Sequence, residues 1–244
     1  MSVPYVPRGT SKRFRVPRTL AADFDKFLEQ DIPDTVMDLE LLHNWYDQFE
    51  DNYEPNYIRG EIYPDSTKSR YENTDNMLNL RCSRTSGIRK GDMVIESDNS
   101  VYILDWAVHL QSNNAPSRML RCNMILNIDR YEEAEVDDLG YVRPNSKSGN
   151  KKIVDRLPCN AYRYDGRPEY VDVSGTPGAT PDALTLIVVQ YNHKTKNIHA
   201  NDKFNWGDDT YYIIDINRVG VDIFGEYGTL TLKAKKKPGE LHGY

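Results

Sequence analysis

Few residues of this chain have the types and spacing that chemistry requires. His193 and His199 are six residues apart around an expected turn, a pattern too loose for a zinc-ligand signature. The paired aspartates in "VDD" (136–138) and "GDD" (207–209) are oxygen ligands that suit a divalent cation. A calcium loop, however, needs more oxygen ligands at fixed offsets than either stretch supplies. We therefore expect no metal site and no cofactor.

A catalytic pair of carboxylates is the other chemistry to consider. Asp105 and Asp215 occupy equivalent positions in a repeat described below, which indicates that each does the same local job in its own unit. His109 follows an apolar run without a nearby cysteine or acidic cluster. The chain lacks the GxSxG, HExxH, P-loop and GxGxxG motifs. We expect no enzyme, and a hydrolase that uses an acidic pair is the weakest alternative.

Composition limits the remaining classes. The net charge of −6 argues against general nucleic-acid binding, and no run approaches the roughly 18 apolar residues of a membrane span. The N-terminus has cations but no apolar core, so it does not predict a secretory signal. Cys82, Cys122 and Cys159 form no CxxC and are expected to be reduced, half-buried thiols. The 17 tyrosines suit strands whose outer face meets a protein or a sugar.

The first 55 residues are expected to differ from the rest. Residues 1–19 form an extended basic arm, which is either a disordered tail or a strap that docks on an acidic partner. Its cations, expected at a partner interface, are Arg8, Lys12, Arg13, Arg15 and Arg18. Residues 20–55 are expected to be helical: one helix over 20–30, and a second over 35–49 with Asp34 as its cap and an apolar stripe at helical spacing.

From Tyr57 onward the pattern is β. Short apolar runs bounded by turn residues predict a mainly β chain of tandem small, SH3-like β-barrel units. We expect the first unit over 56–131, a loop or linker over 132–152 that either projects or connects, and the second unit with a C-terminal tail over 153–244.

A repeat supports the two units. A shift of 110 residues without gaps aligns eight identical positions, which favours a duplicated β unit. Each unit would contain a strand, an Asp-rich turn (Asp98-Asn99 and Asp208-Asp209) and a strongly apolar strand. The aligned pairs are Thr85 with Thr195, Ile88 with Ile198, Asp92 with Asp202, Asp98 with Asp208, Tyr102 with Tyr212, Ile103 with Ile213, Asp105 with Asp215 and Leu120 with Leu230.

Several strands are apolar on both faces, as in "YYIIDI" and "LTLIVVQY". A strand of a solitary barrel alternates apolar with polar, so the other β unit, the N-terminal helices or a neighbouring subunit must cover the second face. We expect Trp206, Tyr211 and Ile213 at an interface with another copy or a partner.

Three phrases resemble head–tail connector proteins of tailed bacteriophages, the head-closure or stopper group. They are "SGIRKGDMVIESDNSVYILDW" (86–106), "SRMLRCNMILNIDR" (117–130) and "DKFNWGDDTYYIIDIN" (202–217), followed by "GTLTL". The resemblance covers roughly residues 57–236, and the arm and helices are not part of it.

The resemblance implies a structural protein that forms a homo-oligomeric ring in the virion neck, between the portal or adaptor and the tail terminator or tail tube. Double-stranded DNA would pass through the ring without specific binding, which an acidic wall suits. Loops would face the channel, and we assign Asn113, Asn114, Asp137 and Asp138 to that role. A tail-completion protein, or a carbohydrate-binding adsorption protein at the tail tip, is the alternative.

Overall fold

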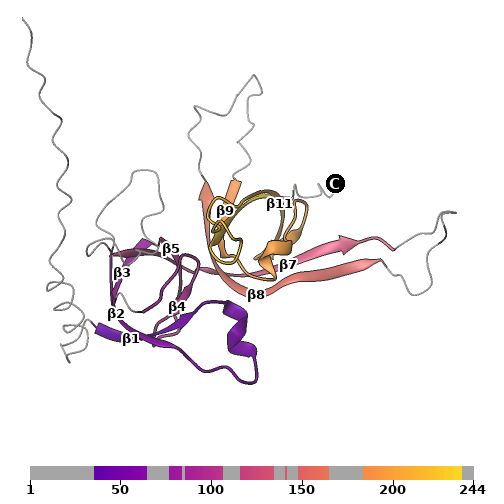
Figure 1. Cartoon of the computed structure of the whole chain (residues 1–244). Coiled ribbons are helices and arrows are strands. Elements are labelled where there is room, and N and C mark those ends of the chain that lie inside the picture. Colours follow the sequence, from indigo (N-terminus) through magenta and orange to yellow (C-terminus); the bar gives the residue numbers. More distant parts are fainter. Residues whose placement is uncertain are drawn as a thin grey trace, which may run out of the picture.

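The strands of the computed structural model form two closed antiparallel barrels that lie side by side (Figure 1). The predicted fold class, a mainly β chain with tandem small barrels, is confirmed. The structure describes residues 36–64, 77–83, 86–106, 116–134, 141, 148–164 and 184–237. The basic arm, the expected helix over 20–30 and His109 lie outside the described residues. Among the residues described, none of the helices has the length and apolarity needed to cross a membrane.

The first barrel has the strand order β1-β2-β3-β6-β5-β4, and β4 closes it by pairing with β1. Its core contains Leu39, Leu80, Leu104 and Met119, each at most 1% exposed. The six strands are β1 (Val36–Leu42), β2 (Tyr57–Pro64), β3 (Met77–Cys82), β4 (Met93–Ile95), β5 (Val101–Trp106) and β6 (Ser117–Arg121).

The second barrel repeats this topology, with the order β7-β8-β9-β12-β11-β10, and β10 pairs back to β7. Each strand therefore has its counterpart six strands later, which supports the predicted duplication. The six strands are β7 (Met124–Glu132), β8 (Gly149–Tyr164), β9 (Leu184–Gln190), β10 (Lys203–Trp206), β11 (Asp209–Asn217) and β12 (Thr229–Lys236).

The expected unit boundaries are wrong. The first barrel begins at Val36 rather than at 56, and the barrels divide between Arg121 and Met124. Glu132 and Gly149–Lys152, at the two ends of the expected linker, belong instead to the strands of a β7–β8 hairpin that extends beyond the second barrel (Figure 1). The sequence does not indicate this hairpin because the polar ends of the two strands, Arg130–Glu132 and Gly149–Lys152, have a loop-like composition.

The predicted helix over 35–49 is also wrong. Residues Val36–Leu42 form strand β1, and only Trp45–Phe49 form a short 3-10 helix, η1. Two periodicities overlap here: apolar residues at helical spacing, and an alternation in which Leu39 and Leu41 are buried while Asp38 is exposed. The alternation prevails because β1 pairs with both β2 and β4 and so closes the barrel.

One of the two buried clusters draws on both barrels, and we call it the shared core. In β5, Tyr102 and Leu104 belong to the core of the first barrel, whereas Ile103 joins a cluster that includes Val188 and Val189 of β9. The second apolar face of these strands is therefore covered by the other unit of the same chain, one of the three covers expected. This removes the argument that β9 needs a neighbouring subunit to cover it.

Polar contacts reinforce this junction. Gln190 at the end of β9 is 1% exposed. Its Oε1 accepts a hydrogen bond from Trp45 N (2.8 Å), and its Nε2 donates to Gly91 O (2.9 Å) and His43 O (3.2 Å). On the other side of η1, the Tyr46 hydroxyl donates to Asp155 O (2.9 Å). One side chain of the second barrel thus satisfies three backbone groups in the β1–β2 and β3–β4 connections of the first barrel.

Candidate functional site

Among the described residues, the structure does not bring the candidate metal ligands together. The imidazole of His193 packs edge-on against the Tyr46 ring, with centroids 5.6 Å apart, whereas the backbone N–H of His199 donates to Asp202. Asp209 pairs with Lys236 across the β11–β12 ladder. Within the described ranges, no group of three His, Cys, Asp or Glu side chains is placed to hold a metal ion.

The repeated carboxylates each have a local partner. Asp105 forms an ion pair with Arg118 on β6, and Asp215 pairs with Lys233 on β12 at 2.8 Å. The bulge of β5 falls at Asp105 itself, whereas that of β11 falls at Ile214, so Asp215 lies one residue beyond the structural counterpart of Asp105. The interpretation that each aspartate does a local job in its own unit is supported: each joins two neighbouring strands.

A buried aspartate precedes the strand that closes each barrel, and the sequence alone did not assign it a role. Asp92 and Asp202 are each 1% exposed and lie just before β4 and β10. The Oδ2 atom of Asp92 accepts from Arg89 N at 2.6 Å, and that of Asp202 accepts from His199 N at 2.8 Å. These two backbone donors are also 110 residues apart. The sequence therefore contained a sign of this role, because the repeat aligns Asp92 with Asp202.

The basic side chains that meet these aspartates occupy equivalent places but differ in type. The Asp202 carboxylate accepts from Arg130 Nε (2.7 Å) and Nη2 (2.9 Å). In the first barrel, Asp92 Oδ1 lies 3.0 Å from His43 Nδ1, within ion-pair distance but without the alignment of a hydrogen bond. Each of these side chains comes directly after the residue that pairs with the first residue of the closing strand. His43 follows Leu42, which pairs with Met93 of β4. Arg130 follows Asp129, which pairs with Lys203 of β10. The second barrel therefore has the better-bonded closure.

Of the three described interface candidates, one is wrong. Ile213 is 0% exposed and belongs to the buried core, because β11 turns this side chain into the second barrel. Tyr211 is half-buried and stacks on Phe204 with ring centroids 5.3 Å apart, and Trp206 is 37% exposed beside it. The arm cations, Asn113, Asn114, Asp137 and Asp138 lie outside the described residues.

The most exposed apolar side chains lie elsewhere, on the loop between β11 and β12, residues 218–228, which we call the apolar loop. Val219, Ile223 and Phe224 are 90%, 92% and 78% exposed. The base of the loop is held in place: Val221 bridges to Gly228 and packs against the shared core. The sequence did not indicate this loop because residues typical of strands precede and follow it.

Asp222 organises the apolar loop from within. Its carboxylate accepts hydrogen bonds from the backbone N–H groups of Glu226 (2.6 Å), Tyr227 (3.1 Å) and Phe224 (3.1 Å). Desolvation raises the pKa of this carboxyl group, but hydrogen bonds from the backbone of Tyr227, Glu226, Phe224 and Gly225 outweigh it, so the net pKa lies below the ordinary value. The charged carboxylate is thus the form that the loop stabilises.

The order of the apolar loop should therefore depend on pH. Because the folded pKa of Asp222 is lowered, its contribution is complete above the ordinary value of about 3.9 and is lost as pH falls through the folded pKa. We expect the amide resonances of Phe224, Glu226 and Tyr227 to hold steady from pH 7 to about pH 4 and to shift below it. Asp222→Asn should shift them at neutral pH. Unchanged resonances between pH 7 and pH 2 would contradict this role.

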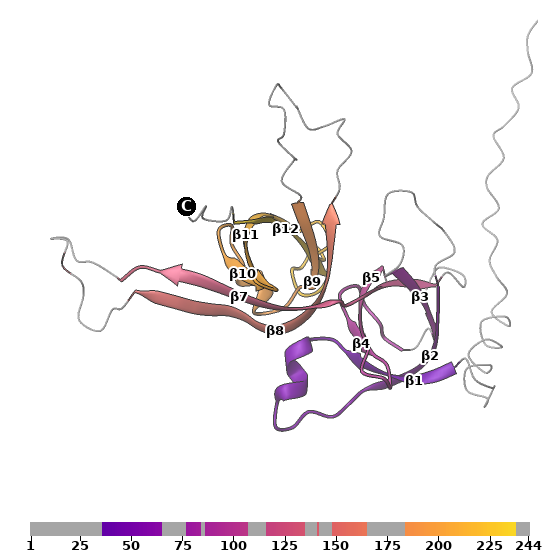
Figure 2. The same ribbon diagram turned by 180° about the vertical axis from the view of Figure 1, so that it is seen from behind.

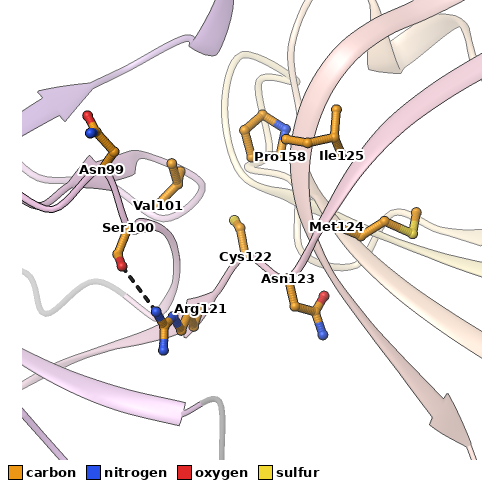
Figure 3. Close-up of a pocket in the computed structure, with 9 residues that line it drawn as sticks. All are labelled: Asn99, Ser100, Val101, Arg121, Cys122, Asn123, Met124, Ile125 and Pro158. Carbon is orange, nitrogen blue, oxygen red and sulfur yellow. Dashed lines mark hydrogen bonds between the residues drawn. The ribbon is translucent and has the colours of Figure 1, made fainter.

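A pocket of about 350 Å³ lies at the other notable place, the connection between the barrels (Figure 3). Val101, Cys122 and Met124 supply apolar surface, and Ile125 on its second-barrel side is 54% exposed. Arg121 Nη2 donates to Ser100 Oγ at 3.2 Å. Burial raises the pKa of the Cys122 thiol to about 12 and that of Cys159 well above its ordinary value, so neither is an activated nucleophile.

Two barrels of one topology are each closed by a buried aspartate, and an apolar loop and a pocket lie on the surface of the joined pair. Comparison with known proteins adds no assignment, since no family model, curated protein or solved structure matches the chain.

Proposed function

We propose that this chain is a structural virion protein of a tailed bacteriophage, a subunit of the neck ring that joins the portal to the tail around the DNA channel. The observation that carries the proposal is the joined pair of like barrels with the β7–β8 hairpin extending beyond it (Figure 2). Ring subunits must hold their shape while their surfaces engage neighbours, and a shared buried core meets that need.

The phrases that resemble connector proteins lie in the framework of this pair. Residues 86–106 contain Asp92 and the β4–β5 hairpin, and residues 202–217 run from Asp202 through β11. In that hairpin Asn99 has a φ of 65°, the positive value that the predicted Asp98-Asn99 turn requires. In the β10–β11 turn, Gly207 has the positive φ, in place of the predicted Asp208-Asp209. The resemblance therefore supports the role through the fold, and contact specificity would lie in the loops.

The charge and the exposed aromatic residues favour a neck scaffold over a sugar-binding protein. A net charge of −6 suits a wall along which DNA slides, because few Lys and Arg contacts would retain its phosphates. A sugar platform needs neighbouring exposed rings, whereas Phe49, Tyr57, Trp106 and Tyr131, each more than half exposed, lie on four separate elements, η1, β2, β5 and β7. The neighbouring rings of Trp206 and Tyr211 are less exposed: Trp206 is 37% exposed and Tyr211 is half-buried. The expected partners are copies of this chain, the portal or adaptor, and the tail terminator or tube.

Particle labelling tests the proposal. Antibodies against the purified chain, carried on gold, should mark the neck of phage particles produced from the genome that encodes it. Label at the tail tip would favour the adsorption alternative, and unlabelled particles would overturn a virion role. Particles assembled without the chain then separate the two neck roles: a stopper is needed to retain DNA in the head, whereas a tail-completion protein is needed to join the tail.

A further inference from the structure

We infer that the apolar loop of one copy inserts into the junction pocket of a second copy, and that this contact joins adjacent subunits. The inference deepens the proposed ring and rests on it. The loop presents Val219, Ile223 and Phe224 to solvent, and water-exposed side chains of this size in one braced loop mark an interaction site. An aromatic side chain held at a loop tip is a typical anchor for a partner pocket.

The loop is prepared for insertion because its backbone is already ordered. Three hydrogen bonds to Asp222 fix the turn, and Val221 fixes its base in the shared core. The Arg89 guanidinium also lies over the Tyr227 ring, 5.3 Å from its centroid. A preordered loop loses little conformational entropy when it docks, which favours affinity.

The junction pocket complements the loop in both size and charge. Its 350 Å³ lies within the range of about 300–1,000 Å³ that holds compact ligands, and Val101, Met124 and Ile125 offer apolar contacts. Arg121 is the charged residue that lines it, whereas the apolar loop carries two anions, Asp222 and Glu226, and one cation, Arg218, at its first position. The same acidic character disfavours an anionic membrane surface as the loop's target.

The loop and the pocket of one chain lie at different ends of the junction. The base of the loop, at Gly228, contacts Gly91, which lies just before β4 begins. The pocket includes Asn99–Val101, which lie beyond the other end of β4, where the turn leads into β5. The loop therefore leaves its own pocket open, and its tip residues stay exposed. A contact between two different surfaces of one chain is heterologous, the kind that closes into a ring when the rotation between copies permits.

Engineered cysteines test the contact directly. Chains carrying Ile125→Cys and chains carrying Ile223→Cys, both with Cys122→Ala, should form a disulfide-linked dimer when mixed under mild oxidation. A single chain with both substitutions should form a ladder of covalent oligomers. The Cys122→Ala chain alone should remain unlinked, because burial protects Cys159 and partial burial raises the pKa of the remaining Cys82 thiol, which disfavours its reactive thiolate. Absence of the mixed dimer at the highest soluble concentration would overturn the inference.

Equilibrium measurements give a second readout. In sedimentation velocity, Phe224→Asp should weaken self-association at least tenfold, whereas Tyr57→Asp, a matched change at a 63% exposed site on β2, should leave it within twofold. Arg121→Glu should weaken it, and Glu226→Arg in the same chain should restore it in part. Equal behaviour of Phe224→Asp and Tyr57→Asp would overturn the inference. A neck label without this contact would leave the proposed function standing; the contact without a neck label would refute that function alone.

Discussion

Arg130→Met should lower the free energy of unfolding by about 3–5 kcal/mol, because it leaves a buried carboxylate without its cation. Asp202 is 1% exposed and Arg130 supplies two hydrogen bonds to it, at 2.7 and 2.9 Å. Methionine retains most of the aliphatic length of arginine, so the loss reports the charge rather than the packing. The hydrogen bond to Asp202 raises the pKa of Arg130, which keeps the guanidinium charged at every accessible pH.

Urea unfolding monitored by tryptophan fluorescence measures this loss. The matched control is Lys151→Met, which removes a cation from the exposed Lys151–Glu132 pair at the outer end of the β7–β8 hairpin. Surface pairs contribute about 0–1 kcal/mol, so the control should unfold close to the wild type. Equal stability of Arg130→Met and Lys151→Met would show that the buried closure of the second barrel does not need its cation.

The two barrels also show how far the repeat could be followed in the sequence. The shift of 110 holds from Arg89 to β4, since His199, Asp202 and Lys203 make the equivalent contacts. It slips by one residue within the next hairpin: Met93 pairs with Ile103, but Lys203 pairs with Tyr212. The second turn is one residue shorter, and an alignment without gaps cannot detect that change.

Beyond the hairpin, residues that the shift of 110 aligns no longer occupy equivalent positions in the two barrels. Leu104 pairs with Met119, and its counterpart Ile213 pairs with Ala234. The structural counterpart of Met119 is therefore Ala234. It follows that Leu120 does not correspond to Leu230, although the alignment pairs them. The extra residues lie before β12, where the second unit inserts the apolar loop. Sequence patterns predicted strands, turns and duplication from local chemistry. They could not predict the shared core, the pocket or the closure by Arg130, because these depend on contacts between distant segments.

Gly91→Ala should lower the free energy of unfolding by roughly 2–5 kcal/mol, the sum of backbone strain and overpacking. Gly91 has a φ of +89°, a conformation that disfavours any side chain with a Cβ atom. A Cβ atom there would lie 2.5 Å from the carbonyl carbon of Gly228 and 2.8 Å from its Cα, both backbone atoms that cannot turn aside. The barrels approach so closely here that only two glycines fit.

Gly87→Ala separates the two causes. Gly87 also has a positive φ, of +70°, but a Cβ atom there meets nothing within 4 Å. It should therefore cost only the backbone strain of about 1–2 kcal/mol, and equal losses in the two variants would show that the Gly91–Gly228 approach does not constrain the junction. Because Gly228 ends the apolar loop, Gly91→Ala should also shift the amide resonances of Phe224 and Tyr227, whereas Gly87→Ala should not. The packing of the two barrels would then be the support that holds the apolar loop in place for a neighbouring copy.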